Sequence, residues 1–180
     1  LTINNSTAVS FAGAIGGAGA NQNNLSLVKA GSGSLALSGS LTYTGNTTVS
    51  AGSMSVGSLS IPDGVTLSVV DVGGAFNATS LALGSSTGCS VAFTGFASAT
   101  VAPVMVTNLT VNGAVTVTLV GAFSTGQFPL IQFSSGTLSG TGSLAVQQAG
   151  LPRGVSASLV TNVPNSTIDV VLTASPLVWV

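Results

Sequence analysis

The chain has 180 residues, of which 45% are hydrophobic and only 3% are charged, and its formal net charge at pH 7 is −1. With two Lys or Arg residues in total, it lacks the cations needed to bind nucleic acid through phosphates. Histidine is absent, which removes the commonest general base and the commonest zinc ligand. A nearly neutral surface permits association between copies of the chain.

The length fits one continuous domain. Short apolar runs broken by Gly-rich corners predict an all-β solenoid, with about seven to nine coils of roughly 20–25 residues. We expect coils over 1–120 and a C-terminal cap with a terminal strand over 121–180. The alternative fold is a β-sandwich or jelly-roll-like module. No window reaches the roughly 18 apolar residues of a membrane-spanning helix.

The first part of the chain reads as short strands and corners. Residues 1–11 alternate as two short strands, and 13–24 are rich in Gly and Asn. The start at Leu1 without a leader-like segment is expected of a processed mature protein or a fragment. A dinucleotide-binding loop at 13–19 is excluded because no amphipathic helix follows it, so we expect no cofactor.

The clearest pattern lies at 25–56, LSLVKAGSGSLALSGSLTYTGNTTVSAGSMSV. Alternation at period two predicts that Leu35 and Leu37 face the core while Ser34 and Ser38 face solvent. Corners recur every few residues, which is too often for the strands of an ordinary sandwich. We interpret Lys29, the only lysine, as a solvated corner residue.

This stretch resembles the autotransporter passenger-associated strand repeat. The matching positions are Leu27, Lys29, Gly31, Gly33, Leu35, Leu37, Gly39, Tyr43, Gly45, Thr47 or Thr48, Val49, Gly52 and Met54. Leu41 replaces the usual Asn of the pattern, and Met54 replaces its final Leu. The resemblance implies a right-handed parallel β-helix on an exported, surface-displayed or secreted protein. It implies no single activity, because such passengers carry many.

A looser recurrence follows at 58–70, 80–93 and 108–120. Each segment has a short strand, a Gly-containing bend and a β-branched strand. The leading residues Leu59, Leu81 and Leu109 are separated by 22 and 28 residues, which are plausible coil lengths. The Asp-Gly and Asn-Gly pairs at 63–64 and 112–113 suit tight bends, but they would also suit antiparallel hairpins.

The composition changes again near Gly121. The segments GQFPLIQF, LPRGVSASLV and STIDVVL resemble the C-terminal end of passenger and repeat proteins. Their larger apolar residues would plug the open end of a coil stack, which solenoids require. Beyond Pro176 the apolar residues 177–180 need a burial partner. They either fold back onto their own module, begin a following domain, or dock on the next subunit as an added strand or plug, which is the hypothesis we carry forward.

No catalytic, cofactor or metal site is predicted. The G-x-S-x-G pattern at 84–88 has no base available, and Asp63 and Asp71 are interpreted as turn residues rather than a carboxylate pair. Cys89, the single cysteine, is expected to be a small buried residue.

The sequence therefore predicts a non-enzymatic extracellular or cell-surface structural protein, the self-assembling subunit of a filament or surface layer. The alternative is a surface-displayed adhesin or passenger module that binds glycans or host surfaces. A cross-β amyloid is a third possibility. The candidate assembly contacts are Leu1, Ile3, Leu177, Val178, Trp179 and Val180.

Overall fold

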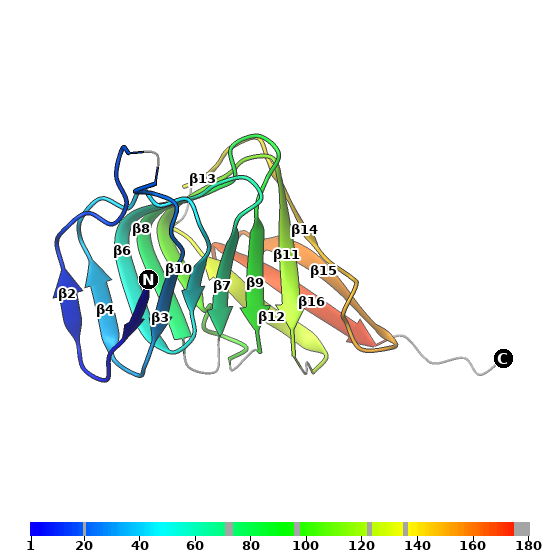
Figure 1. Ribbon diagram of the computed structural model, residues 1–180. Coiled ribbons are helices and arrows are strands. Elements are labelled where there is room, and N and C mark those ends of the chain that lie inside the picture. The colour runs from blue at the N-terminus through cyan, green and yellow to red at the C-terminus, as the bar shows by residue number, and fades with distance from the viewer. Residues whose placement is uncertain (20, 71–73, 96–97, 122–123, 135–136, 175–180) are drawn as a thin grey trace.

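The computed structural model describes residues 1–19, 21–70, 74–95, 98–121, 124–134 and 137–174. All helices and strands assigned within these ranges are β-strands; no residue in them is helical (Figure 1). The all-β prediction is confirmed. Because none of the described residues is helical, no helix among them could cross a membrane.

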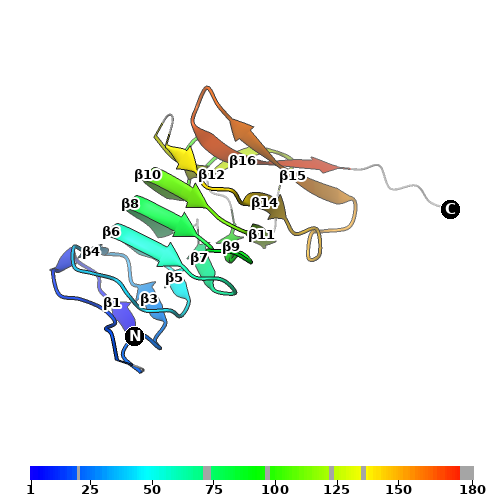
Figure 2. The same cartoon turned by 90° about the horizontal axis from the view of Figure 1, so that it is seen from above.

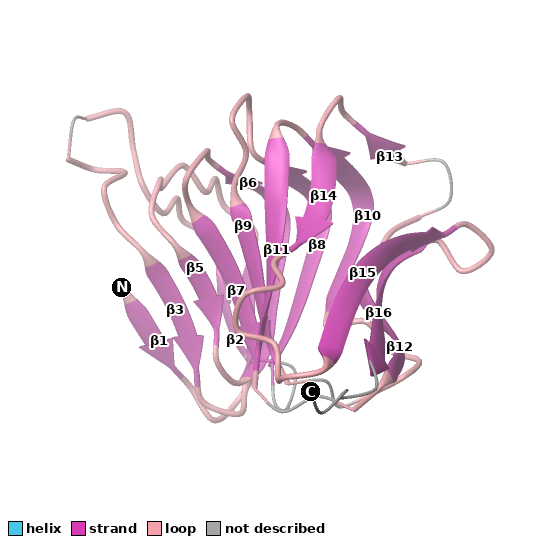
Figure 3. Cartoon of the chain, turned by 90° about the vertical axis from the view of Figure 1, so that its right-hand side faces the viewer, coloured by secondary structure: helices cyan, strands magenta, loops and turns pink. Residues whose placement is uncertain are grey.

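The strands form two sheets, which Figure 3 shows with the first sheet facing the viewer. The first sheet contains, in spatial order, β1 (Thr2–Asn4), β3 (Leu27–Ala30), β5 (Thr47–Val49), β7 (Thr66–Val70), β9 (Ser90–Thr94), β11 (Ala114–Val120) and β14 (Ser143–Val146). The second contains β2 (Val9–Phe11), β4 (Ser34–Leu37), β6 (Gly52–Ile61), β8 (Gly74–Leu83), β10 (Val104–Val111), β12 (Gly126–Gln132), β16 (Thr167–Ala174) and β15 (Val155–Asn162), with β13 (Leu138–Ser139) beside β10.

Successive strands alternate between the two sheets from β1 to β12, so the chain winds as a β-solenoid of about five turns. Neighbouring strands along this part of each sheet pair in parallel, as β6, β8 and β10 do in Figure 2. The jelly-roll alternative is therefore wrong, since such modules are antiparallel. The strands on either side of Asp63-Gly64 and of Asn112-Gly113 lie in different sheets, so neither pair makes a hairpin.

The predicted internal recurrence is confirmed by the strand register. Leu59 pairs with Leu81, and Leu81 pairs with Leu109, so the three leucines stack in one row of the core. Each of them is at most 2% exposed. Halfway along β6, Gly57 and Ser58 are both exposed, so the alternation skips a residue there and resumes with Leu59 facing inward.

The expectation of seven to nine coils is wrong. Some coils are longer than expected, as the 28 residues between Leu81 and Leu109 show. In addition, β15 and β16 do not wind; they form an antiparallel hairpin whose second strand pairs antiparallel with β12. Ile168, Val170 and Leu172 of this hairpin belong to the hydrophobic core. The hairpin therefore covers the C-terminal part of the core.

The strand repeat shows why its residue types recur. Leu35 and Leu37 are 1% and 2% exposed, whereas Ser34 and Ser38 are exposed, which confirms the predicted facing. Tyr43 is buried, and its hydroxyl lies 2.8 Å from Thr47 Oγ1.

Gly52 has a φ of +67°, and a side chain there would collide with the carbonyl oxygens of Gly31 and Gly33 one coil below. Glycine at such corners lets adjacent coils stack closely.

Candidate assembly surface

Both sheets end in an open edge at the N-terminal end of the solenoid. Within the described residues, β1 pairs only with β3, and β2 pairs only with β4. One side of each edge strand therefore offers backbone N–H and C=O groups to an added strand. Figure 1 shows these two strands at the end of the stack opposite β15 and β16.

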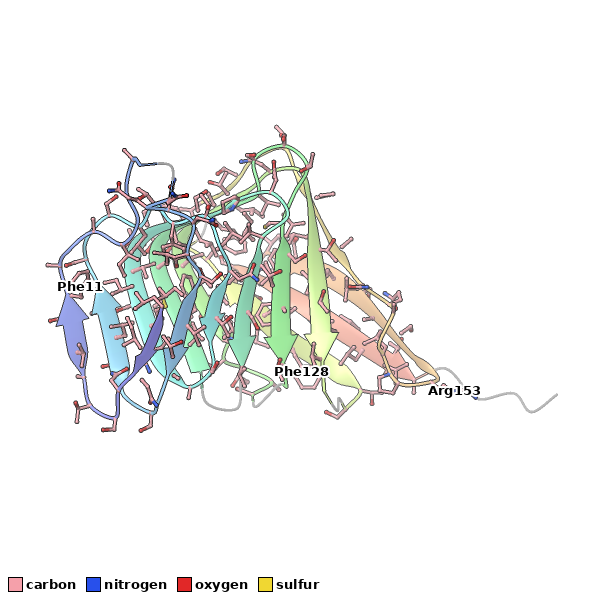
Figure 4. All side chains as sticks on the ribbon, in the orientation of Figure 1. Phe11, Phe128 and Arg153 are labelled. Carbon is pink, nitrogen blue, oxygen red and sulfur yellow. The ribbon has the colours of Figure 1, made fainter. Side chains whose placement is uncertain are left out.

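An apolar cavity of about 610 Å³ opens at the same end. The large apolar side chains of its lining are those of Leu1, Ile3, Phe11, Ile15 and Leu25. Leu1 is 59% exposed and Phe11 is 46% exposed, which is unusual for large side chains beside a core. Figure 4 shows Phe11 at this edge of the molecule. We call these five residues, with β1 and β2, the N-terminal surface.

The structure brings two of the predicted assembly contacts, Leu1 and Ile3, together in this surface. Leu177, Val178, Trp179 and Val180 lie outside the described residues. Phe11, Ile15 and Leu25 also line the cavity but were not predicted as contacts. The alternation over 1–11 could have suggested Phe11, whereas Ile15 and Leu25 join it only through the folding of the first corner.

Lys29 is buried, and the prediction of a solvated corner residue is wrong. It occupies an inward position of β3 in register with Ile3 and Val49, and none of its surface is exposed. Its Nζ donates to the carbonyl oxygens of Ala30, Gly31 and Ala51 at 2.8, 2.8 and 3.1 Å. Burial lowers the pKa of Lys29. The ammonium group thus ties together two corners of adjacent coils.

Asp63 lies against the G-x-S-x-G loop, which the sequence alone did not predict. Its carboxylate accepts hydrogen bonds from the backbone N–H groups of Ser85, Ser86 and Gly88 and from both serine hydroxyls. The side chain of Ser85 and the backbone N–H groups of Ser85 and Gly88 hold the pKa of Asp63 far below its usual value. Such a carboxylate is a poor proton acceptor at neutral pH. We therefore interpret Asp63 and the 84–88 loop as a structural clasp between two corners. Asp71 lies outside the described residues.

Cys89 is buried, as predicted, and burial raises the pKa of its thiol to about 11. A thiol of this kind is a weak nucleophile. No group of three or more metal-ligating Cys, Asp or Glu side chains occurs in the part of the chain that the structure describes.

Stacked parallel strands, Gly-lined corners and a buried repeat core define this chain as a β-solenoid. Residues 27–56 match the family model described as Passenger-associated-transport-repeat. These residues form β3, β4, β5 and the first half of β6, so the match lies on two successive coils. A search of curated proteins and a search of solved structures found no significant match.

Proposed function

We propose that this chain is a non-enzymatic structural module of an exported protein, outside the cell or on its surface, that assembles end to end with copies of itself. The observation that carries the proposal is the N-terminal surface, where two open sheet edges surround an apolar cavity. Exposed edges and apolar end surfaces of a solenoid promote association unless a further unit covers them.

The partner on this surface is the segment 177–180 of the next copy. Leu177, Val178, Trp179 and Val180 offer four apolar side chains after Pro176, which cannot donate to a strand ladder. Burial of apolar area stabilises by about 25 cal/mol per Å², so these side chains contribute several kcal/mol before ordering costs. An extended segment can also pair with an open edge through its backbone.

The surface charge supports self-association as well. Charged residues make up 3% of the chain, so copies experience little electrostatic repulsion on approach. The passenger-type repeat supports a location outside the cell, because the resemblance is to exported proteins.

Deletion of residues 176–180 tests the assembly. Light scattering coupled to size-exclusion chromatography and negative-stain microscopy should show polymers of the intact chain and folded monomers of the truncated chain. The double variant Leu1→Asp, Phe11→Asp should also abolish polymers, because it places charge on the N-terminal surface. Val163→Ser is the matched control, since Val163 is 75% exposed but lies on the β15–β16 turn. Polymers that survive both changes would contradict the proposal.

The alternative function is a displayed module that binds glycans. Of the aromatic rings that the structure describes, only Phe11 is exposed, and Tyr43 is buried. The described residues therefore offer a sugar only one exposed aromatic ring to stack against. Glycan-array binding by the monomeric double variant would favour this alternative.

A further inference from the structure

A polar cavity lies on the outer face of the second sheet, beside the C-terminal hairpin. Its volume is about 470 Å³, and its walls come from residues before β10, from β12 and from the β15–β16 hairpin. Ile168 and Val170 belong to the core, so alternation along β16 places Thr167 and Asp169 on the outer face. Its polar lining includes Gln127, Gln132, Asn162, Asn165, Thr167 and Asp169. We call it the Asp169 cavity.

Asp169 is almost completely buried, with 3% of its surface exposed. Its Oδ2 accepts hydrogen bonds from Gln127 Nε2 at 2.7 Å and from Asn162 Nδ2 at 3.0 Å. Its Oδ1 has no hydrogen-bond partner, and neither does Oγ1 of Thr167, which is 6% exposed. The Thr167 side chain is near enough to Asp169 to lower its pKa, but no hydrogen bond of normal geometry satisfies either of these two buried oxygen atoms, which costs free energy.

The carboxylate of Asp169 is ionised at neutral pH. Burial by itself would raise its pKa, but the neighbouring polar side chains of Thr167, Asn162 and Gln127 outweigh burial and keep the pKa below its usual value. The chain has one lysine and one arginine, and neither forms an ion pair with Asp169 in the described residues. A buried charge without a counter-charge is unfavourable unless something compensates it.

The other wall groups are rich in acceptors. Gln127 and Asn162 turn their NH₂ groups toward Asp169, which leaves their carbonyl oxygens for another donor. An anion would be repelled by the carboxylate. Calcium takes about six to eight oxygen ligands, usually from several carboxylates, and the described lining residues include one carboxylate, that of Asp169. None of the described residues that line the cavity has an aromatic ring to stack against a sugar.

We propose that the Asp169 cavity binds a small organic cation with N–H donors, an alkylammonium or a guanidinium group. The N–H groups of such a cation would hydrogen-bond to Asp169 and Thr167, and its charge would neutralise the carboxylate. Lysine and arginine side chains of a peptide carry these groups, as do free amines. This site is separate from the N-terminal surface, so it does not depend on the assembly proposal.

Titration of the ¹⁵N-labelled chain, followed by NMR, tests the site without any variant. Butylammonium and propylguanidinium chloride are the probes for lysine-like and arginine-like groups, and spermidine is the probe for free polyamines. We expect saturable shifts of the side-chain amide signals of Gln127 and Asn162, and weak or no response to calcium chloride or to methyl glycosides. A response to calcium alone, or to glycosides alone, would overturn the proposal, as would no response to any of the cations.

The variant Asp169→Asn keeps the size of the side chain and removes its charge. We expect it to weaken cation binding about tenfold or more, because hydrogen bonds to a charged group are stronger than those to a neutral one. Asp63→Asn is the matched control, since it removes the same charge far from the cavity. Equal affinity in both variants, with folding checked by circular dichroism, would also overturn the proposal. If Asp169→Asn does not fold, Thr167→Val provides the second variant.

Discussion

The carboxylate of Asp63 accepts a hydrogen bond from the hydroxyl of Ser85, with 2.6 Å between Oδ2 and Oγ, although the residues are 22 positions apart. Asp63 follows β6 and Ser85 follows β8, and these two strands are paired neighbours. The corner of one coil is thus clasped to the corner of the next. Side-chain bonds at corners add to the backbone ladder that holds the coils together.

Asp63→Asn should lower stability at neutral pH and flatten its dependence on acid pH. The folded-state pKa of Asp63 is depressed, so its stabilisation is complete above the ordinary pKa of 3.8 and is lost as pH falls below it. Thermal unfolding of both proteins from neutral to strongly acidic pH measures this difference. Parallel curves for the variant and the wild type would show that the clasp does not stabilise the fold.

Lys29→Met should destabilise the chain by about 1–3 kcal/mol, because the carbonyl groups that Nζ satisfies lose their donor. The pKa of Lys29 is lowered on folding, so the unfolded state binds more protons and stability rises with pH toward the ordinary pKa of 10.5. The variant should lose this rise. Denaturant unfolding at several pH values measures both effects, and an unchanged pH profile would count against the buried ammonium.

Leu81→Ala should cost about 2–5 kcal/mol, since Leu81 is 1% exposed in the middle of the leucine row. Leu138→Ala is the matched control, because Leu138 pairs with Leu109 in the same row but is 38% exposed. The control should cost about 1 kcal/mol or less. Urea denaturation of the two variants gives the comparison, and equal costs would mean that the register is wrong.

Cys89 should resist thiol reagents in the native state and react once the chain unfolds. Burial raises the pKa of its thiol from 9.0 to about 11, so little thiolate is present at neutral pH. Because the pKa of the thiol is higher in the folded state, the neutral buried thiol contributes its full stability below pH 9.0, and this contribution is lost as pH rises toward about 11. Thiol titration with and without denaturant measures the reactivity. Rapid native labelling would contradict the buried placement.

The sequence by itself determined the local geometry of this protein. Period-two alternation assigned Leu35 and Ser34 to opposite faces, and the spacing of Leu59, Leu81 and Leu109 located one row of the core. These predictions succeed because side-chain facing in a strand depends only on alternation and on burial of apolar area.

Only the tertiary structure decided which polar groups the corners bring into contact. Alternation places Lys29 on the inner face, but its three carbonyl partners converge only when two corners stack. The number of turns was overestimated because the sequence does not specify where winding stops and the antiparallel hairpin begins. Likewise, Gln127 hydrogen-bonds to Asp169 although the two are 42 positions apart in the sequence. Contacts between distant polar side chains depend on how coils close, and hydrophobic periodicity carries no information about that closure.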